Sequence, residues 1–222
     1  MPKSKSKKKR AQCGPGPISR RLRSVDAVPP EHDPTKDSPL PMTRLTCDPW
    51  RDPDGALQDL QRVAPTVVDL RLDCPDEKHL LALLSMPNLK RLELLGDDET
   101  PALPGGLPPV GLPTWLSVQG LPLEALQSIL CAFAPSLETL QLTVGTNGLR
   151  AFPESCGQLG RHLECAALRA LKRVVLVRHR PLGASHTPED CTKQLAECRS
   201  VLPPNTQVLC CLCEQVEPEF LP

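Results

Sequence analysis

The chain has 222 residues and no net charge at pH 7, because 26 Lys and Arg residues balance 26 Asp and Glu residues. Its charged fraction of 23% and hydrophobic fraction of 40% are ordinary for a folded protein, which argues against a wholly disordered chain. Only 2% of the residues are aromatic, which argues against sugar-stacking platforms and against single-stranded nucleic-acid readers built on stacked rings.

The sequence predicts a soluble protein of the nucleus or cytoplasm. No apolar run approaches the roughly 18 residues that span a bilayer, and no apolar stretch follows the cationic N-terminus as it would in a secretory signal. The 11 cysteines are odd in number and irregularly spaced. This usage favours reduced intracellular thiols over a disulfide framework.

Residues 1–39 predict a disordered leader that is first basic and then rich in Pro, Asp and Ser. Residues 1–23 hold nine basic and no acidic residues, so the rest of the chain has 17 basic against 26 acidic residues. Three interpretations stay open: a nuclear-localisation signal read by an import receptor, an arm that binds nucleic-acid phosphates, or a solvated tail with no address. The candidate signal residues are Lys3, Lys5, Lys7, Lys8, Lys9 and Arg10.

From residue 40 a short apolar pattern keeps returning. Its clearest copies occupy 64–72, 86–94 and 134–142, and each has a proline at its second residue. Apolar residues stand two, five and seven places after that proline, namely Val67, Leu70, Leu72, Leu89, Leu92, Leu94, Leu137, Leu140 and Leu142. Weaker copies contain Met42, Leu45 and Cys47, then Leu171, Val174 and Leu176, and finally Leu209 with Cys211. A spacing of two predicts a strand with one apolar face.

One more copy is needed between the second and third clean ones, and 106–120 supplies it. Its register stays open, because it would bury either Leu112 and Trp115 or Trp115 and Val118. Helical apolar stripes follow the strands at 54–63, 77–84 and 123–133.

A last helix is predicted to start at Thr187-Pro188-Glu189-Asp190. This segment offers an N-cap, a proline in the first turn and acids against the helix dipole. A strand and a helix that recur every 20 to 35 residues, roughly, predict a solenoid.

A strand of the form L-x-x-L-x-L cannot hide its apolar face alone, so successive strands are expected to lie side by side in a parallel sheet. The copies VVDLRLDC, NLKRLELLG and SLETLQLTVG resemble leucine-rich repeats of the F-box/leucine-rich-repeat kind, over residues 40–213, although no segment resembles the F-box itself. The resemblance implies an irregular α/β leucine-rich-repeat solenoid, with a curved parallel sheet and outer helices. It also implies substrate recognition in ubiquitin transfer. Residues 214–222 are expected to form an acidic C-terminal tail.

The outward strand positions predict a charged concave surface. In this register Arg44 faces Asp69, Asp69 faces Arg91, and Arg71 faces Glu93. Two interpretations stay open: a docking surface for a protein partner, or a solubilising surface whose exposed pairs stabilise the fold by about 0.2 to 1 kcal/mol each. The residues expected to contact a partner are Asp69, Arg71, Arg91, Glu93, Thr139 and Gln141. At the end of the array, Val208, Cys210 and Leu212 are expected to point outward.

No catalytic, cofactor or metal site is predicted. A zinc site built from Cys191, Cys198, Cys210, Cys211 and Cys213 is not expected. CCLC is taken to offer no C-x(2–4)-C pair, and successive residues of a strand point to opposite faces. His162 and Cys165 lie one helical turn apart, but no orienting group or oxyanion donor is marked. The nucleotide-binding, hydrolase and metalloprotease motifs are missing.

The leading hypothesis is therefore a protein-binding scaffold with no enzymatic activity. Its concave surface would bind a partner, as substrate recognition in ubiquitin transfer requires. The alternative is a nuclear protein that binds nucleic acid through its basic leader, with an affinity that falls steeply as salt rises.

Overall fold

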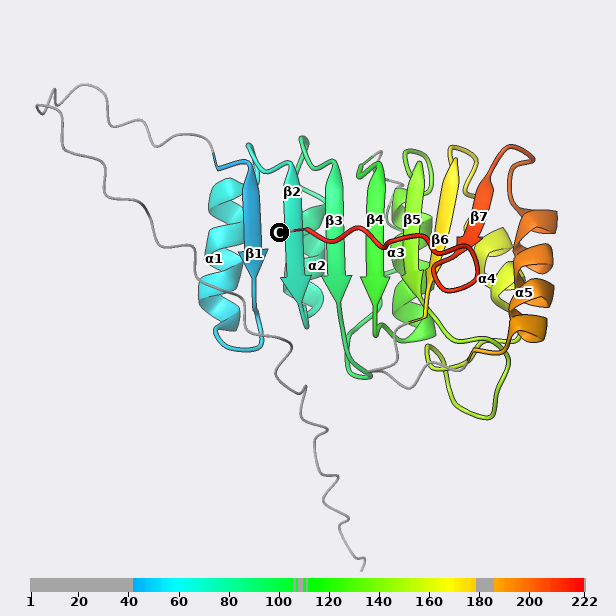
Figure 1. Cartoon of the computed structure of the whole chain (residues 1–222). Coiled ribbons are helices and arrows are strands. Elements are labelled where there is room, and N and C mark those ends of the chain that lie inside the picture. Colours follow the sequence, from blue (N-terminus) through cyan, green and yellow to red (C-terminus); the bar gives the residue numbers. More distant parts are fainter. Residues whose placement is uncertain (1–41, 106, 108–109, 111, 179–185, 222) are drawn as a thin grey trace, which may run out of the picture. The chain divides into compact units, whose positions relative to one another are not determined.

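The computed structural model describes residues 42–105, 107, 110, 112–178 and 186–221. The predicted leader 1–39, with its candidate localisation signal, lies outside these residues. The described chain forms an α/β fold around one all-parallel sheet of seven strands, whose order β1-β2-β3-β4-β5-β6-β7 follows the chain (Figure 1). The strands are β1 (Arg44–Cys47), β2 (Asp69–Asp73), β3 (Arg91–Leu95), β4 (Trp115–Gln119), β5 (Thr139–Thr143), β6 (Arg173–Val177) and β7 (Gln207–Cys210).

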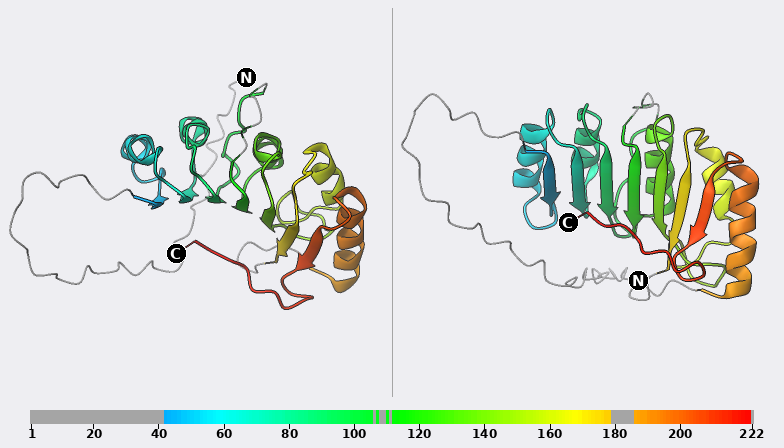
Figure 2. Two further views of the ribbon diagram at one scale, coloured as in Figure 1. Left: turned by 90° about the horizontal axis from the view of Figure 1, so that it is seen from above. Right: turned by 45° about the horizontal axis from the view of Figure 1, so that its top comes forward.

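All helices of the described residues lie on one face of the sheet, and none of them lies on the opposite face (Figure 2). They are α1 (Pro53–Val63), α2 (Glu77–Leu83), α3 (Leu123–Phe133), α4 (Leu159–Cys165) and α5 (Pro188–Val201). The three helices predicted from apolar stripes and the one predicted from its N-terminal signal are confirmed, whereas α4 was not predicted. Between β3 and β4 the described residues form no helix. No described helix has the length and apolar character needed to cross a membrane.

Helix α5 begins where the sequence predicted, with Thr187 as its N-cap. Thr187 accepts a hydrogen bond from the Asp190 backbone N–H at 3.2 Å, and Pro188 occupies the first turn. Proline fits there because its missing N–H would have no partner within the helix. Two acids in the first turn add a favourable interaction with the helix dipole.

The inner face of the sheet consists of two continuous apolar rows, each contributed by one residue per strand. The rows are Leu45, Leu70, Leu92, Leu116, Leu140, Val174 and Val208, and Cys47, Leu72, Leu94, Val118, Leu142, Leu176 and Cys210. The strand pairing places Leu70, Leu92 and Leu140 in one row, which confirms the prediction, and all three are fully buried. Each row hides its side chains behind those of the next strand and under the helices.

The register predicted for β4 is wrong. Leu116 and Val118 face inward, and Trp115 lies on the opposite face, beside Arg91 and Thr139. Both predicted registers treated Trp115 as inward because it is large and apolar. Pro113 stands where the template has its lead-in leucine, so the pattern lost its marker at this strand.

The register predicted for β7 is also wrong, by one residue. Val208 and Cys210 face the core and are buried, whereas Leu209 pairs with Val175 on the opposite face. A slip of one residue exchanges the two faces of a strand. Met42 is a smaller exception in the first copy, since it is exposed rather than buried.

We expect Leu92→Ala to lower the free energy of unfolding by about 2 to 5 kcal/mol, because it leaves a cavity in the middle of the inner row. Leu149→Ala removes the same atoms from a fully exposed side chain and should change the stability by less than about 0.5 kcal/mol. Urea unfolding followed by circular dichroism measures both values. Equal effects would contradict the inner-row arrangement.

Candidate functional site

The face of the sheet that carries no helix, here called the open face, is lined by alternate strand residues. One row on it is Arg44, Asp69, Arg91, Trp115, Thr139 and Arg173, and the next is Thr46, Arg71, Glu93, Ser117, Gln141 and Val175. The strand register confirms that these unlike charges lie opposite one another on neighbouring strands, as predicted. Arg44 Nε lies 2.9 Å from Asp69 Oδ2, and Arg71 Nη1 lies 3.6 Å from Glu93 Oε1.

The chain's own C-terminal segment lies across this face. After β7 the backbone turns, and residues 214–221, here called the tail segment, run back over β6, β5, β4 and β3 toward β2 (Figures 1 and 2). The segment crosses the strands and adds no strand to the sheet edge. Leu221, near its end, is only 6% exposed. The open face is therefore covered along this line by an extended peptide.

Two side chains of the open face hold the backbone of the tail segment. Gln141 donates from Nε2 to the Glu219 carbonyl oxygen at 2.7 Å and accepts the Glu219 N–H at Oε1 at 2.8 Å. Glu93 Oε2 accepts the Leu221 N–H at 2.9 Å. Gln141 Nε2 also donates to Ser117 Oγ at 3.1 Å, which fixes the orientation of the amide. These contacts recognise the main chain of an extended segment, whatever its side chains.

The Glu219 side chain adds a preference for an acid at one position. Its two carboxylate oxygens lie 3.4 Å from Arg91 Nη2 and 3.7 Å from Arg173 Nη1. Arg91 in turn lies over the Trp115 ring, 4.6 Å from its centroid. The Glu219 side chain is about half exposed, so each ion pair contributes about 0.2 to 1 kcal/mol. The two arginines therefore contribute little to the stability of the tail segment on the open face.

Polar side chains on the open face are unusually buried. Glu93 and Gln141 are each 3% exposed, and Ser117 is 5% exposed. Burial is the main cause that raises the pKa of Glu93 above its ordinary value of 4.5, while the Leu221 N–H and Arg71 act in the opposite direction. A buried acid and a buried amide need hydrogen-bond partners, and the tail segment provides them.

The structure places three of the six residues predicted to contact a protein partner against the tail segment, and their contact with a partner stays a prediction. Among the six predicted contact residues, Arg91, Glu93 and Gln141 contact the tail segment. Asp69 and Arg71 instead form ion pairs within the sheet face. Thr139 lies between Trp115 and Arg173, and no hydrogen bond or ion pair joins its side chain to the described tail segment. The prediction missed Arg173, Ser117 and the tail segment itself. A correct register for β4 would have placed Ser117 beside Gln141.

The structure also brings together four potential metal ligands beside β7, the last strand of the sheet. Single ligand atoms of His186, Cys191, Cys210 and Cys213 all lie within 4.8 Å of one another. The argument against a metal site was wrong on one point, because Cys210-Cys211-Leu212-Cys213 does contain a C-x2-C pair. The strand ends at Cys210, and the turn that follows brings Cys213 back to the same side.

The thiols of this group differ in their ease of ionisation. Burial raises the pKa of Cys191 to about 12. Burial also acts to raise the pKa of Cys210, but the backbone N–H groups of Cys213 and Leu212 and the neighbouring Cys191 and Arg178 outweigh it and lower the pKa. The two other cysteines that the sequence considered, Cys198 and Cys211, stand outside the group.

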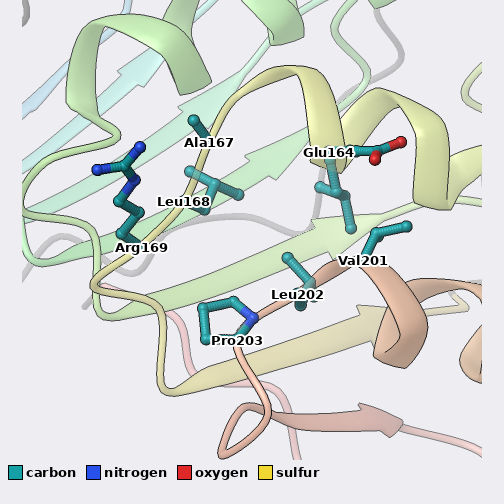
Figure 3. Close-up of a pocket in the computed structure, with 8 residues that line it drawn as sticks. Glu164, Ala167, Leu168, Arg169, Val201, Leu202 and Pro203 are labelled. Atoms are coloured by element: carbon teal, nitrogen blue, oxygen red, sulfur yellow. The ribbon is translucent and has the colours of Figure 1, made fainter.

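Two hollows among the described residues carry little chemistry. One hollow of about 230 Å³ lies between the ends of α4 and α5 (Figure 3) and is lined by Leu163, Glu164, Ala167, Leu168, Arg169, Val201, Leu202 and Pro203. Another, of about 180 Å³, adjoins Leu221 on the open face and is lined by Arg44, Leu45, Thr46 and Asp69. His162 Nδ1 contacts Gln127 Nε2 at 3.1 Å rather than Cys165.

Comparisons with family models, with curated proteins and with solved structures found no match to this chain.

We expect Gln141→Leu to loosen the tail segment, because the variant keeps the bulk of the side chain but loses both hydrogen bonds to Glu219. At about 1 kcal/mol for each bond, the amides of Glu219 and Leu221 should exchange at least about tenfold faster. Thr139→Ala, on the same face, is the matched control and should leave their exchange unchanged. Amide hydrogen exchange followed by NMR measures this, and equal rates in Gln141→Leu and the native chain would contradict the contact.

We expect Glu93→Gln to change how stability depends on pH. Because the pKa of Glu93 is raised in the folded state, that state binds the proton more tightly than the unfolded chain does. The contribution of Glu93 is therefore favourable at low pH and is lost as pH rises from 4.5 through the folded-state value. Relative to the native chain, Glu93→Gln should gain stability as pH rises over that range. Urea midpoints at a series of pH values test this, and a constant difference would contradict it.

Proposed function

We propose that this protein is a binding scaffold without enzymatic activity, and that its open face binds an extended peptide segment of a protein partner. The observation that carries the proposal is the two-way hydrogen bonding of Gln141 with the Glu219 backbone, together with the acceptance of the Leu221 N–H by Glu93. The chain's own tail segment is then the resident ligand of the site. A partner would bind by displacing it.

The chemistry of the site describes the partner segment. The segment is extended, it offers a backbone C=O and N–H to Gln141, and it has an acid placed between Arg91 and Arg173. Two residues after the acid stands an apolar residue, as Leu221 follows Glu219. The hollow beside Leu221 gives room for a side chain larger than leucine at that position.

The tail segment binds the open face with modest strength. Its ion pairs are partly exposed, and its backbone hydrogen bonds to the face are few. A covalently attached segment still competes strongly, since its effective concentration is on the order of millimolar. A partner must therefore bind tightly, or the tail segment must first be removed or modified.

The strand-and-helix units support the narrower proposal of an irregular leucine-rich-repeat solenoid whose open face is concave. Resemblance to the repeats of F-box/leucine-rich-repeat proteins is the ground for proposing substrate recognition in ubiquitin transfer. The alternative proposal, nucleic-acid binding by the basic leader, depends on residues outside the described part of the chain. Its test is deletion of residues 1–23, which should abolish a salt-dependent affinity.

We expect a labelled peptide with the sequence of residues 214–222 to bind a chain that ends at residue 214 at least about tenfold more tightly than it binds the full chain, because the attached tail segment competes. Fluorescence anisotropy measures both affinities.

A charge exchange tests the register of that peptide. Arg91→Glu should weaken its binding several-fold, and a peptide with Glu219→Lys should recover part of the loss, because the exchanged charges attract again. Thr139→Ala is the control and should bind the original peptide normally. Binding that is equal in the full and shortened chains, or that ignores Arg91→Glu, would contradict the proposal.

A further inference from the structure

We infer that His186, Cys191, Cys210 and Cys213 form a binding site for a zinc ion at the C-terminal end of the sheet. The four ligand atoms come from three separate places in the chain. His186 precedes the N-cap of α5, Cys191 lies in the first turn of α5, and Cys210 and Cys213 flank the turn after β7. Three thiols with one imidazole is a ligand set typical of structural zinc sites.

The separations between the ligand atoms match the edges of a zinc tetrahedron. With usual zinc–ligand bond lengths, tetrahedral geometry places two sulfurs about 3.8 Å apart and a sulfur and a nitrogen about 3.5 Å apart. Cys213 Sγ lies 3.8 Å from Cys191 Sγ. His186 Nε2 lies 3.6 Å from Cys210 Sγ and 3.4 Å from Cys213 Sγ. All four atoms lie within 4.8 Å of one another, so a small contraction completes the tetrahedron.

A buried arginine beside the group supplies an independent reason for a negative centre there. Arg178 is 2% exposed and forms no ion pair among the described residues. Its guanidinium donates to the Val144 carbonyl and to Gln194 Oε1, and its Nη2 lies 3.9 Å from Cys191 Sγ. A buried charge is costly unless an opposite charge compensates it. Zinc with three thiolates and a neutral imidazole carries one negative charge, which compensates Arg178.

The turn that carries the C-x2-C pair is already in place. The Glu214 N–H donates to the Cys210 carbonyl oxygen at 3.0 Å, and the Cys210 N–H donates to Glu214 Oε2 at 2.6 Å. The two bonds close the backbone around residues 210–214. Binding of zinc releases the three thiol protons to solvent and leaves the imidazole neutral.

Zinc at this position would fix the point where the tail segment leaves the sheet. The zinc ion would join the end of β7 to the first turn of α5 and to His186, which precedes the N-cap of that helix. Terminal units of a stacked array need such a closure, because they have a neighbour on one side only. The site is separate from the open face, so its test does not depend on peptide binding.

The test uses the full chain, purified in reducing buffer and loaded with zinc or cobalt. We expect one zinc per chain by mass spectrometry of the metal content. After exchange for Co²⁺, we expect the visible bands of a tetrahedral complex and a near-ultraviolet thiolate charge-transfer band. Cys213→Ser and His186→Ala should each weaken zinc binding by about 100-fold or more, since loss of an outer-shell partner alone costs up to about that much. Cys131→Ser, an exposed thiol on α3, is the matched control and should bind zinc normally.

Absence of stoichiometric metal from fully reduced chain would overturn the assignment. So would an octahedral cobalt spectrum, or equal zinc binding in Cys213→Ser and the native chain. Cys213 and His186 are not in the apolar core, so both variants should fold, and circular dichroism checks that they do. The cobalt spectrum of the native chain tests the ligand set even if a variant fails to fold.

Discussion

No strand of this protein can bury its inner apolar side chains without the neighbouring strands and the helices, and the rest of the structure depends on that constraint. It forces the strands into chain order in one parallel sheet, with the helices on the face where the apolar rows lie. The opposite face is then free to carry polar residues. The same constraint leaves two edge strands, β1 and β7, that have a neighbouring strand on one side only. At the C-terminal end, α5 and the turn after β7 close the array, and the cysteines and His186 gather there.

On the open face, the same geometry holds the tail segment. Parallel strands in regular register set Arg91, Glu93, Gln141 and Arg173 at fixed spacings across the sheet. An extended segment that crosses the strands meets one such position after another. Because Glu93 and Gln141 are almost fully buried, they require partners for their polar atoms. The tail segment meets that requirement in the described structure, and any competing segment must offer the same backbone groups.

The repeating part of the fold could be predicted from the sequence, because Leu70, Leu92 and Leu140 follow a clear template with a proline before them. Prediction failed where the template weakened. At β4, Pro113 replaced the lead-in leucine, and Trp115 was assigned to the core when it supports Arg91 on the open face. At β7, a slip of one residue sent Cys210 to the wrong face. The metal site was rejected for a different reason, because the C-x2-C spacing of Cys210 and Cys213 was overlooked. The approach of Cys191 to Cys213, and of residues 214–221 to the sheet, is tertiary contact that no local pattern encodes.

The central claim is that the tail segment and a partner segment compete for one surface. Its most direct test is the NMR relaxation of isotope-labelled full chain while an unlabelled peptide of residues 214–222 is added to saturation. Our account predicts that the amides of Val216, Glu219 and Leu221 gain fast motion in proportion to the bound peptide, as the attached segment is displaced. If the peptide binds while these amides stay as rigid as before, the two segments occupy different surfaces, and the claim is wrong.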